Sequence, residues 1–122
     1  MEYSGNSLRR SIKNTVRIAA IIAFGGLQDK VKMPKFLENC TGSFLYEQLI
    51  HMIDSGKINK AENELLNMID VYEKSNLEIA LAVYDYINDK EDCFLEQNGY
   101  SREEIEDGVK SVMAMYGYRG IF

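Results

Sequence analysis

Helix start and stop signals recur along this chain, and no other feature constrains its fold as strongly. Three segments carry a capping-box pattern. In this pattern a short polar side chain accepts a hydrogen bond from the backbone N–H three residues later, and the glutamate at that later position accepts one from the backbone N–H of the first residue. These segments are Asn59–Glu62, Ser75–Glu78 and Ser101–Glu104. Thr41 or Ser43 is predicted to open a further helix. Apolar residues at helical spacing follow each start.

Glycines lie where these helices are expected to end, because only glycine adopts the left-handed conformation of a helix C-terminus at low cost. They are Gly25–Gly26, Gly56, Gly99 and Gly117. Together the signals predict helices at about 6–24, 43–54, 59–73, 76–96 and 102–116, with a short turn at 34–39 after Pro34. No sustained alternation of period two indicates a strand. The sequence therefore predicts an all-α fold.

The length of 122 residues is typical of one domain with its own core. We expect an N-terminal helix at 6–24, a linker at 25–42, two helical hairpins over 43–116 and a tail at 117–122. The connection 54–59 is so short that the helices on either side of it should pack antiparallel. The facing apolar stripes of this hairpin are Leu45, Leu49, Met52 and Ile53, and Ala61, Leu65, Met68, Ile69 and Tyr72. In the second hairpin the stripes are Ile79, Ala80, Val83, Tyr84 and Ile87, and Ile105, Val109, Val112, Met113 and Tyr116.

The turn of the first hairpin, Gly56-Lys57-Ile58-Asn59-Lys60-Ala61, resembles the turn of a tetratricopeptide repeat, where a glycine precedes a small alanine by five positions. The chain departs from that pattern at Leu49, where the first helix usually has glycine, and at Glu73, where the repeat usually ends in proline. No second copy follows at a period of about 34 residues. The resemblance implies one tetratricopeptide-like hairpin rather than a repeat array.

Over residues 6–118 the chain also resembles an uncharacterised family of short bacterial proteins, a domain of unknown function. The segments that carry this resemblance are Ile53-Asp54-Ser55-Gly56-Lys57-Ile58-Asn59-Lys60-Ala61-Glu62-Asn63, Tyr84-Asp85-Tyr86, and Phe94-Leu95-Glu96 through Ser101-Arg102-Glu103-Glu104-Ile105-Glu106. The resemblance implies an all-helical fold and no known activity.

No group of residues in the sequence has the pattern of a catalytic or metal site. The single histidine, His51, lies beside an apolar stripe, where a packed or surface histidine is the expected interpretation. A calcium-binding loop needs glycine at its sixth position, and the acidic stretch from Asp85 to Glu96 has Lys90 or Phe94 there. We therefore predict no catalytic residue, no metal and no cofactor, and a solvated helix face for Asp85, Asp89, Glu91, Asp92 and Glu96.

Two isolated cysteines, Cys40 and Cys93, are typical of free thiols in a reducing compartment, and a disulfide between them is the less favoured alternative. The longest nearly apolar run, Ile18 to Leu27, is ten residues long. A membrane span needs about 20 residues. A cleaved signal peptide is disfavoured, because Phe24-Gly25-Gly26-Leu27 lacks the small-residue pattern of a cleavage site. We expect a cytoplasmic protein.

Charge is distributed unevenly along the chain. Residues 1–37 hold seven Lys and Arg against two acids, a net charge of +5, and residues 38–122 hold seven against 17, a net charge of −10. Between Tyr3 and Gln28 there is no acid. Because the acidic part would repel a phosphate backbone, we predict no nucleic-acid binding.

The N-terminal helix combines a basic stripe with an end that is apolar on every side. A helix that is apolar all round must be covered all round. Three partners could cover this helix end: the rest of the domain, a second copy or another protein, and an anionic membrane or ligand. We predict a non-enzymatic protein–protein interaction or homo-oligomerisation module, with peripheral binding of an anionic membrane or ligand as the alternative. The predicted partner-binding residues are Arg9, Arg10, Lys13, Arg17, Ile18, Ile21, Ile22 and Phe24.

Overall fold

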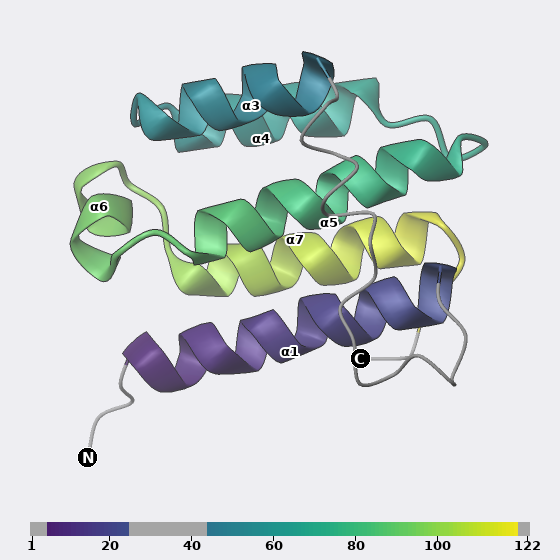
Figure 1. Cartoon of the computed structure of the whole chain (residues 1–122), viewed down its shortest axis with the longest axis horizontal. Coiled ribbons are helices and arrows are strands. Elements are labelled where there is room, and N and C mark those ends of the chain that lie inside the picture. The colour runs from purple at the N-terminus through teal and green to yellow at the C-terminus, as the bar shows by residue number, and fades with distance from the viewer. Residues whose placement is uncertain (1–4, 25–43, 120–122) are drawn as a thin grey trace.

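A computed structural model describes residues 5–24 and 44–119 of the chain (Figure 1). These two ranges contain six α-helices and no strand, which confirms the predicted all-α fold. The helices are α1 (Gly5–Phe24), α3 (Phe44–Asp54), α4 (Ile58–Met68), α5 (Lys74–Asn88), α6 (Asp92–Gln97) and α7 (Arg102–Met115). The predicted linker 25–42 and turn 34–39, Cys40 and the end of the tail lie outside the described residues, and Cys93 is a free, exposed thiol.

Three layers of helices make up the fold (Figure 1). α3 and α4 pack against each other on one side, α5 and α7 form the middle, and α1 is the outer layer on the opposite side. α5 contacts α1, α3, α4 and α7. Its buried side chains point in most directions around its axis, as expected of a central helix: Leu77, Ala80, Leu81, Ala82, Val83, Tyr84 and Ile87.

Both predicted helix pairs are present. Leu49 and Ile53 of α3, and Ala61 and Leu65 of α4, are buried in the core, and α5 packs along α7. Tyr72 is the exception, because it is 91% exposed instead of facing α3. The cause is that α4 ends at Met68, so the last residues predicted for this helix form a turn. The tetratricopeptide-like packing of the first pair stays a prediction.

The helix predicted at 76–96 is wrong in one respect, because the chain breaks it into α5 and α6. The guanidinium of Arg102, which is 6% exposed, reaches back to this break. It donates to the carbonyl oxygens of Asn88 at 2.7 Å and Lys90 at 2.6 Å, and to Asp92 Oδ1 at 2.8 Å. Carbonyls at a helix end need partners when they are buried. Arg102 supplies them, and so favours ending the helix at Asn88.

The predicted helix starts and stops have mixed outcomes. Ser101 and Glu104 form the predicted capping box, with Ser101 N donating to Glu104 Oε2 at 2.9 Å. The boxes predicted at Asn59 and Ser75 are wrong, because α4 and α5 begin one residue earlier than those positions and their N-caps make no side-chain hydrogen bond. Thr41 and Ser43 lie outside the described residues. Three predicted stops are confirmed by left-handed φ angles of 89°, 67° and 91°, at Gly56, Gly99 and Gly117.

Candidate interaction surface on helix α1

Helix α1 presents one face to the domain and the opposite face to solvent. Its inner face packs on α5 and α7 through side chains that are almost completely buried: Ile12, Val16, Ala19, Ala20 and Ala23. Three of these are alanines, which allow the helix axes to approach closely. Of the three predicted covers, the rest of the domain does not cover the apolar end on every side, because Ile18 is 48% exposed and Ile22 is 38% exposed. The domain therefore covers one side of this helix end and leaves another open.

Two residues of the predicted basic stripe are used inside the chain. Lys13 Nζ lies 3.0 Å from Asp85 Oδ1 and 3.2 Å from Asp89 Oδ1, both at the end of α5. Arg9 Nη2 donates to the carbonyl oxygen of Asp89 at 2.6 Å, and Asn88 Nδ2 donates to the carbonyl oxygen of Arg9 at 2.9 Å. These bonds hold the first half of α1 on α5. They also remove Asp85 from the predicted solvated acidic face, since this side chain is buried.

The partners in this ion pair differ in how well their charges are stabilised. Burial lowers the pKa of Lys13, but the hydrogen bond to Asp85 and the charges of both aspartates outweigh it, so the pKa is raised overall. For Asp85 burial is the largest influence and raises the pKa, against the opposing effect of Lys13. The Asp85 side chain is more deeply buried than that of Lys13, so its carboxylate is the less stable of the two charges. Acidification protonates this carboxylate, whereas the Lys13 ammonium stays charged.

The outward residues of α1 form a smaller surface than the eight predicted partner-binding residues. We define the α1 outer face as Arg10, Arg17, Ile18, Ile21 and Ile22. Arg10, Ile18 and Ile22 are exposed, and Arg17 and Ile21 are half-buried. The isoleucines are neighbours at spacings of three and four residues. No carboxylate among the described residues pairs with either arginine.

Phe24, the last predicted partner-binding residue, lies at the edge of this surface rather than on it. Its side chain is half-buried, and the Lys74 ammonium sits over its ring, 5.3 Å from the ring centre. Such a contact between a cation and an aromatic face stabilises the position of both groups. It ties the end of α1 to the start of α5.

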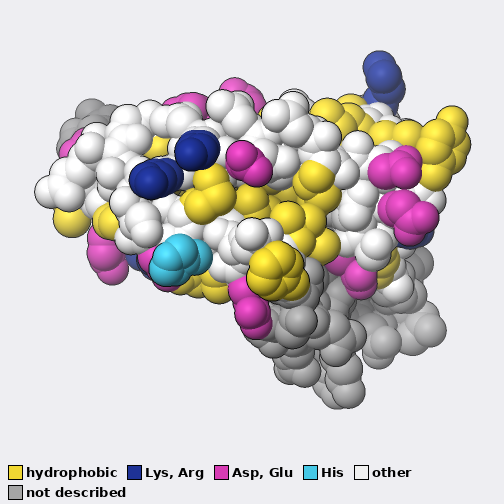
Figure 2. Space-filling view, turned by 90° about the horizontal axis from the view of Figure 1, so that it is seen from above, with side chains coloured by type: hydrophobic (Ala, Val, Ile, Leu, Met, Phe, Trp, Pro, Cys, Tyr) yellow, Lys and Arg dark blue, Asp and Glu magenta, His cyan; other side chains and the backbone are white. Residues whose placement is uncertain are grey.

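A second surface, on the outer face of α3, was missed by the sequence reasoning. A hollow of about 520 Å³ lies there, and the described residues that line it are Phe44, Glu47, Gln48, His51 and Met52. Phe44 is 76% exposed. In Figure 2 hydrophobic side chains gather across this side of the molecule, with the single histidine of the chain at their edge. Phe44 and Met52, which lie two helical turns apart with the polar Gln48 between them, were the available signal for this surface.

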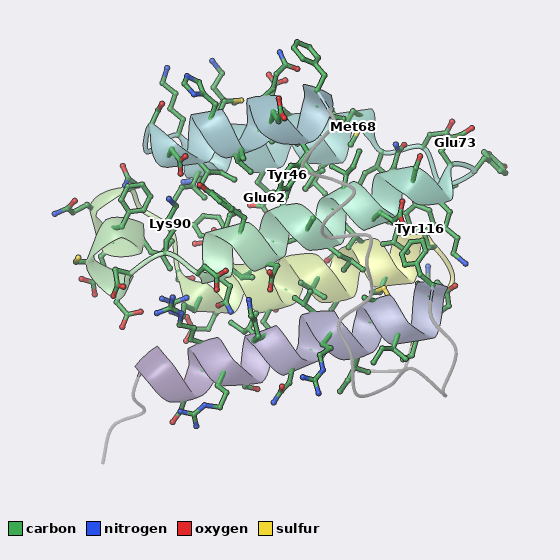
Figure 3. All side chains as sticks on the ribbon, in the orientation of Figure 1. Tyr46, Glu62, Met68, Glu73, Lys90 and Tyr116 are labelled. Atoms are coloured by element: carbon green, nitrogen blue, oxygen red, sulfur yellow. The ribbon has the colours of Figure 1, made fainter. Side chains whose placement is uncertain are left out.

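A polar cluster between α4, α5 and α7 was also missed. The hydroxyl of Tyr84 donates to Glu62 Oε2 at 2.7 Å, and burial followed by this hydrogen bond raises the pKa of Tyr84. The buried hydroxyl of Tyr100 has no well-formed hydrogen bond among the described residues, although burial and the nearby Glu62 charge raise its pKa. Figure 3 places Glu62 beside the middle layer. Each tyrosine hydroxyl is enclosed by packed side chains, so we interpret this cluster as structural.

Comparison with known proteins places the chain in a family. The model of a family of unknown function, DUF6483, matches residues 3–117, almost the whole chain. The chain belongs to the DUF6483 family. No curated protein and no solved structure matches it. The predicted resemblance to a family of unknown function is thereby confirmed, and DUF6483 membership assigns no activity to any residue.

The described residues of this DUF6483 chain were also searched for membrane-spanning helices and for metal sites. None of its described helices has the length and hydrophobicity needed to cross a bilayer. Within the described ranges, no three His, Cys, Asp or Glu side chains come together in a way that would hold a metal ion.

Proposed function

We propose that the protein is a non-enzymatic protein-interaction module, and that the α1 outer face docks on an apolar protein surface with acidic edges. The observation that carries this proposal is the partial exposure of Ile18 and Ile22 on a helix whose opposite face is already packed. Full burial of an exposed isoleucine stabilises an interface by about 1.5–3 kcal/mol, so the part of each side chain still open contributes about half of that.

Charge specifies the kind of partner. Helix α1 has four cations and no acid, whereas residues 44–119 hold seven Lys and Arg against 16 Asp and Glu. Two of the cations, Arg9 and Lys13, already contact α5. Arg10 and Arg17 remain to steer an acidic partner toward the isoleucines, and such peripheral charges set orientation and association rate more than affinity.

Peripheral binding to an anionic membrane is the second candidate, favoured by the acid-free outer layer that α1 forms. A helix lying on a membrane inserts an apolar face along its length and keeps its cations near the phosphates. On α1 the exposed large apolar side chains are confined to the second half, at Ile18 and Ile22. This short apolar stretch supports a small protein contact better than insertion into lipid.

The test places a photo-crosslinking amino acid at position 22 of the full chain in its native cells. Position 67 is the matched control, because Asn67 is exposed on α4, in the layer opposite α1. We expect one protein adduct from position 22 and none from position 67. The partner is then purified, and its affinity is measured for wild type, Ile18→Asp and Asn67→Asp, which add the same charge to the two layers.

The proposal predicts that Ile18→Asp weakens binding at least about 10-fold and that Asn67→Asp leaves it unchanged. Arg10→Gln combined with Arg17→Gln should slow association and reduce its salt dependence. Equal adducts from both positions would overturn the proposal. So would sedimentation of the protein with anionic vesicles that is lost in the double glutamine variant, and this second result would establish the membrane candidate.

A further inference from the structure

The open side of α1 has two halves of different chemistry. The second half carries three isoleucines, of which Ile18 is 48% exposed and Ile22 is 38% exposed. The exposed residues of the first half are all polar: Ser7, Arg10, Ser11 and Asn14. A partner that matches this side of the helix must therefore be apolar beside its second half only.

A second copy of the same face meets this requirement in one orientation. When two α1 helices pack antiparallel about a two-fold axis at the level of Ala20, Ile18 of each copy lies opposite Ile22 of the other. At a rise of 1.5 Å per residue, each Arg10 then lies about 15 Å along the helix from the axis, so the two Arg10 side chains are about 30 Å apart. A parallel pair would instead bring these like charges side by side. Antiparallel packing of α1 on itself is therefore favoured.

Helix α5 adds an acidic group beside α1 at the level of the same axis. Three contacts fix the antiparallel register of the two helices: Arg9 to Asp89, Lys13 to Asp85, and Phe24 to Lys74. In this register Glu78, which follows Lys74 by one helical turn on the same face of α5, is level with Ala20. Glu78 is half-buried, burial raises its pKa, and it forms no ion pair with a described residue. A cation brought to this edge would stabilise its ionised form.

Arg17 is the cation that a second copy would bring there. It follows Lys13 by one helical turn, so it lies on the α5 side of α1, and it pairs with no described carboxylate. The two-fold axis keeps the α5 sides of both copies on the same side of the pair. Arg17 of one copy is then about 5 Å along the helix from the level of Glu78 in the other. It also lies beside the last turn of the other α1, which has no basic residue to offset the negative end of the helix dipole.

From these observations we infer that the protein forms a closed homodimer in which the α1 outer faces pack antiparallel, with Ile18 on Ile22 and Arg17 of each copy beside Glu78 of the other. The inference rests on the proposed function, because it names the partner of the same surface. Both copies use the same patch, so association stops at two chains. The contact is small, and areas below about 1,200 Å² are typical of weak association.

The first test is sedimentation equilibrium of the full chain at concentrations on the order of 10 µM to 1 mM, where weak contacts are populated. The average mass of wild type should rise to twice that of one chain and stay there. Each substitution acts twice in the dimer, so Ile18→Asp should weaken association about 100-fold. Asn67→Asp adds the same charge to the opposite layer and should dimerise like wild type. Circular dichroism verifies that both variants are folded.

The second test measures the orientation of the two helices. A spin label is placed at position 11, by Ser11→Cys in a chain whose two native cysteines are replaced by serine. Ser11 is exposed and lies nine residues from the predicted axis. Antiparallel packing separates the two labels by about 25–30 Å, whereas parallel packing would leave them about 10 Å apart. Pulsed electron paramagnetic resonance distinguishes these distances.

The third test exchanges the charges of the predicted ion pair. Arg17→Glu alone and Glu78→Lys alone should each weaken dimerisation about 10-fold, because each brings like charges together. The two changes in one chain should restore it to within about 3-fold of wild type. Lys60→Glu is the matched control, since it makes the same change of charge at an exposed position of α4 and should have no effect.

Wild type that stays monomeric over the whole range would overturn the inference, and so would Ile18→Asp that dimerises as strongly as wild type. A label separation near 10 Å, or losses from the two charge changes that simply add, would also overturn it. The proposed function is tested separately by the crosslink at position 22. An adduct there with a different protein, together with a monomeric wild type, would refute the homodimer and leave the interaction module standing.

Discussion

Gly108 provides the sharpest test of how the core is packed. It lies inside α7 and is buried. An alanine in a helix interior is normally more stable than glycine by about 1 kcal/mol. Here a Cβ atom would overlap with the ring and hydroxyl of Tyr84. Tyr84 is fully buried and bonded to Glu62 at 2.7 Å, so the ring has no open space into which to move.

The structure therefore predicts that Gly108→Ala destabilises the protein, opposite to its helix propensity. Overpacking of a core costs about 1–3 kcal/mol. Displacing the Tyr84 hydroxyl from a carboxylate adds part of the about 1.5–3 kcal/mol that such a bond contributes. After subtracting the gain in propensity, we expect a loss of about 2–3 kcal/mol in the free energy of unfolding. Urea unfolding followed by circular dichroism would show a midpoint lower by about 1–2 M.

Two further variants distinguish the steric overlap at Gly108 from the general effect of alanine on helix stability. Ser111→Ala, at an exposed position of α7, should stabilise the protein slightly, by about 0.5 kcal/mol or less. Tyr84→Leu removes the obstructing ring, so adding Gly108→Ala to it should cost much less than in wild type. If Gly108→Ala proves as stable as wild type or more so, α7 does not approach Tyr84 as described.

Three further predictions test other contacts, each by urea unfolding. Arg102→Met should cost at least about 2 kcal/mol, and Arg102→Lys nearly as much, because one ammonium cannot reach Asn88, Lys90 and Asp92 together; unchanged stability of the lysine variant would contradict this role. Lys13→Met leaves the Asp85 carboxylate buried without its cation. Because a folded-state pKa raised above 3.8 favours protonation of the folded protein, this variant should gain stability as pH falls through that folded pKa toward 3.8, and it should gain more than wild type; parallel pH profiles would argue against the pair. Gly56→Ala should be more damaging than Gly99→Ala, for which about 1 kcal/mol is expected. Both glycines have left-handed φ angles, but only at Gly56 would a Cβ meet another side chain, that of Asn98; equal losses would show that backbone conformation alone matters.

Most of the fold could be predicted because its signals are local. Apolar spacing and three of the glycine stops identified the pairing of α3 with α4 and of α5 with α7. Capping was less reliable, since only Ser101 caps as predicted. A short polar side chain can occupy a cap or lie within the first turn, and packing of the neighbouring apolar residues decides between these outcomes.

The candidate surfaces were only partly predictable. The sequence singled out α1, but only five of the eight predicted residues form its outer face. Lys13 and Arg9 bind to the end of α5, some 70 to 80 residues later in the chain. No local sequence pattern encodes that contact. The exposed Tyr72 was assigned to a helix stripe because its spacing alone could not reveal that α4 ends at Met68.

The sequence by itself determined the all-α class, the approximate helix positions and an acid-free first helix, because these depend on residue type and spacing along one segment. Tertiary structure decided where the helix predicted at 76–96 breaks, which face of α1 is open and which cations remain available. Arg102 illustrates the reason: it stabilises the end of α5 from the start of α7, through bonds to Asn88 and Lys90. Such a contact stabilises a helix end only after the two segments have packed together, so its effect follows from the fold and not from either segment alone.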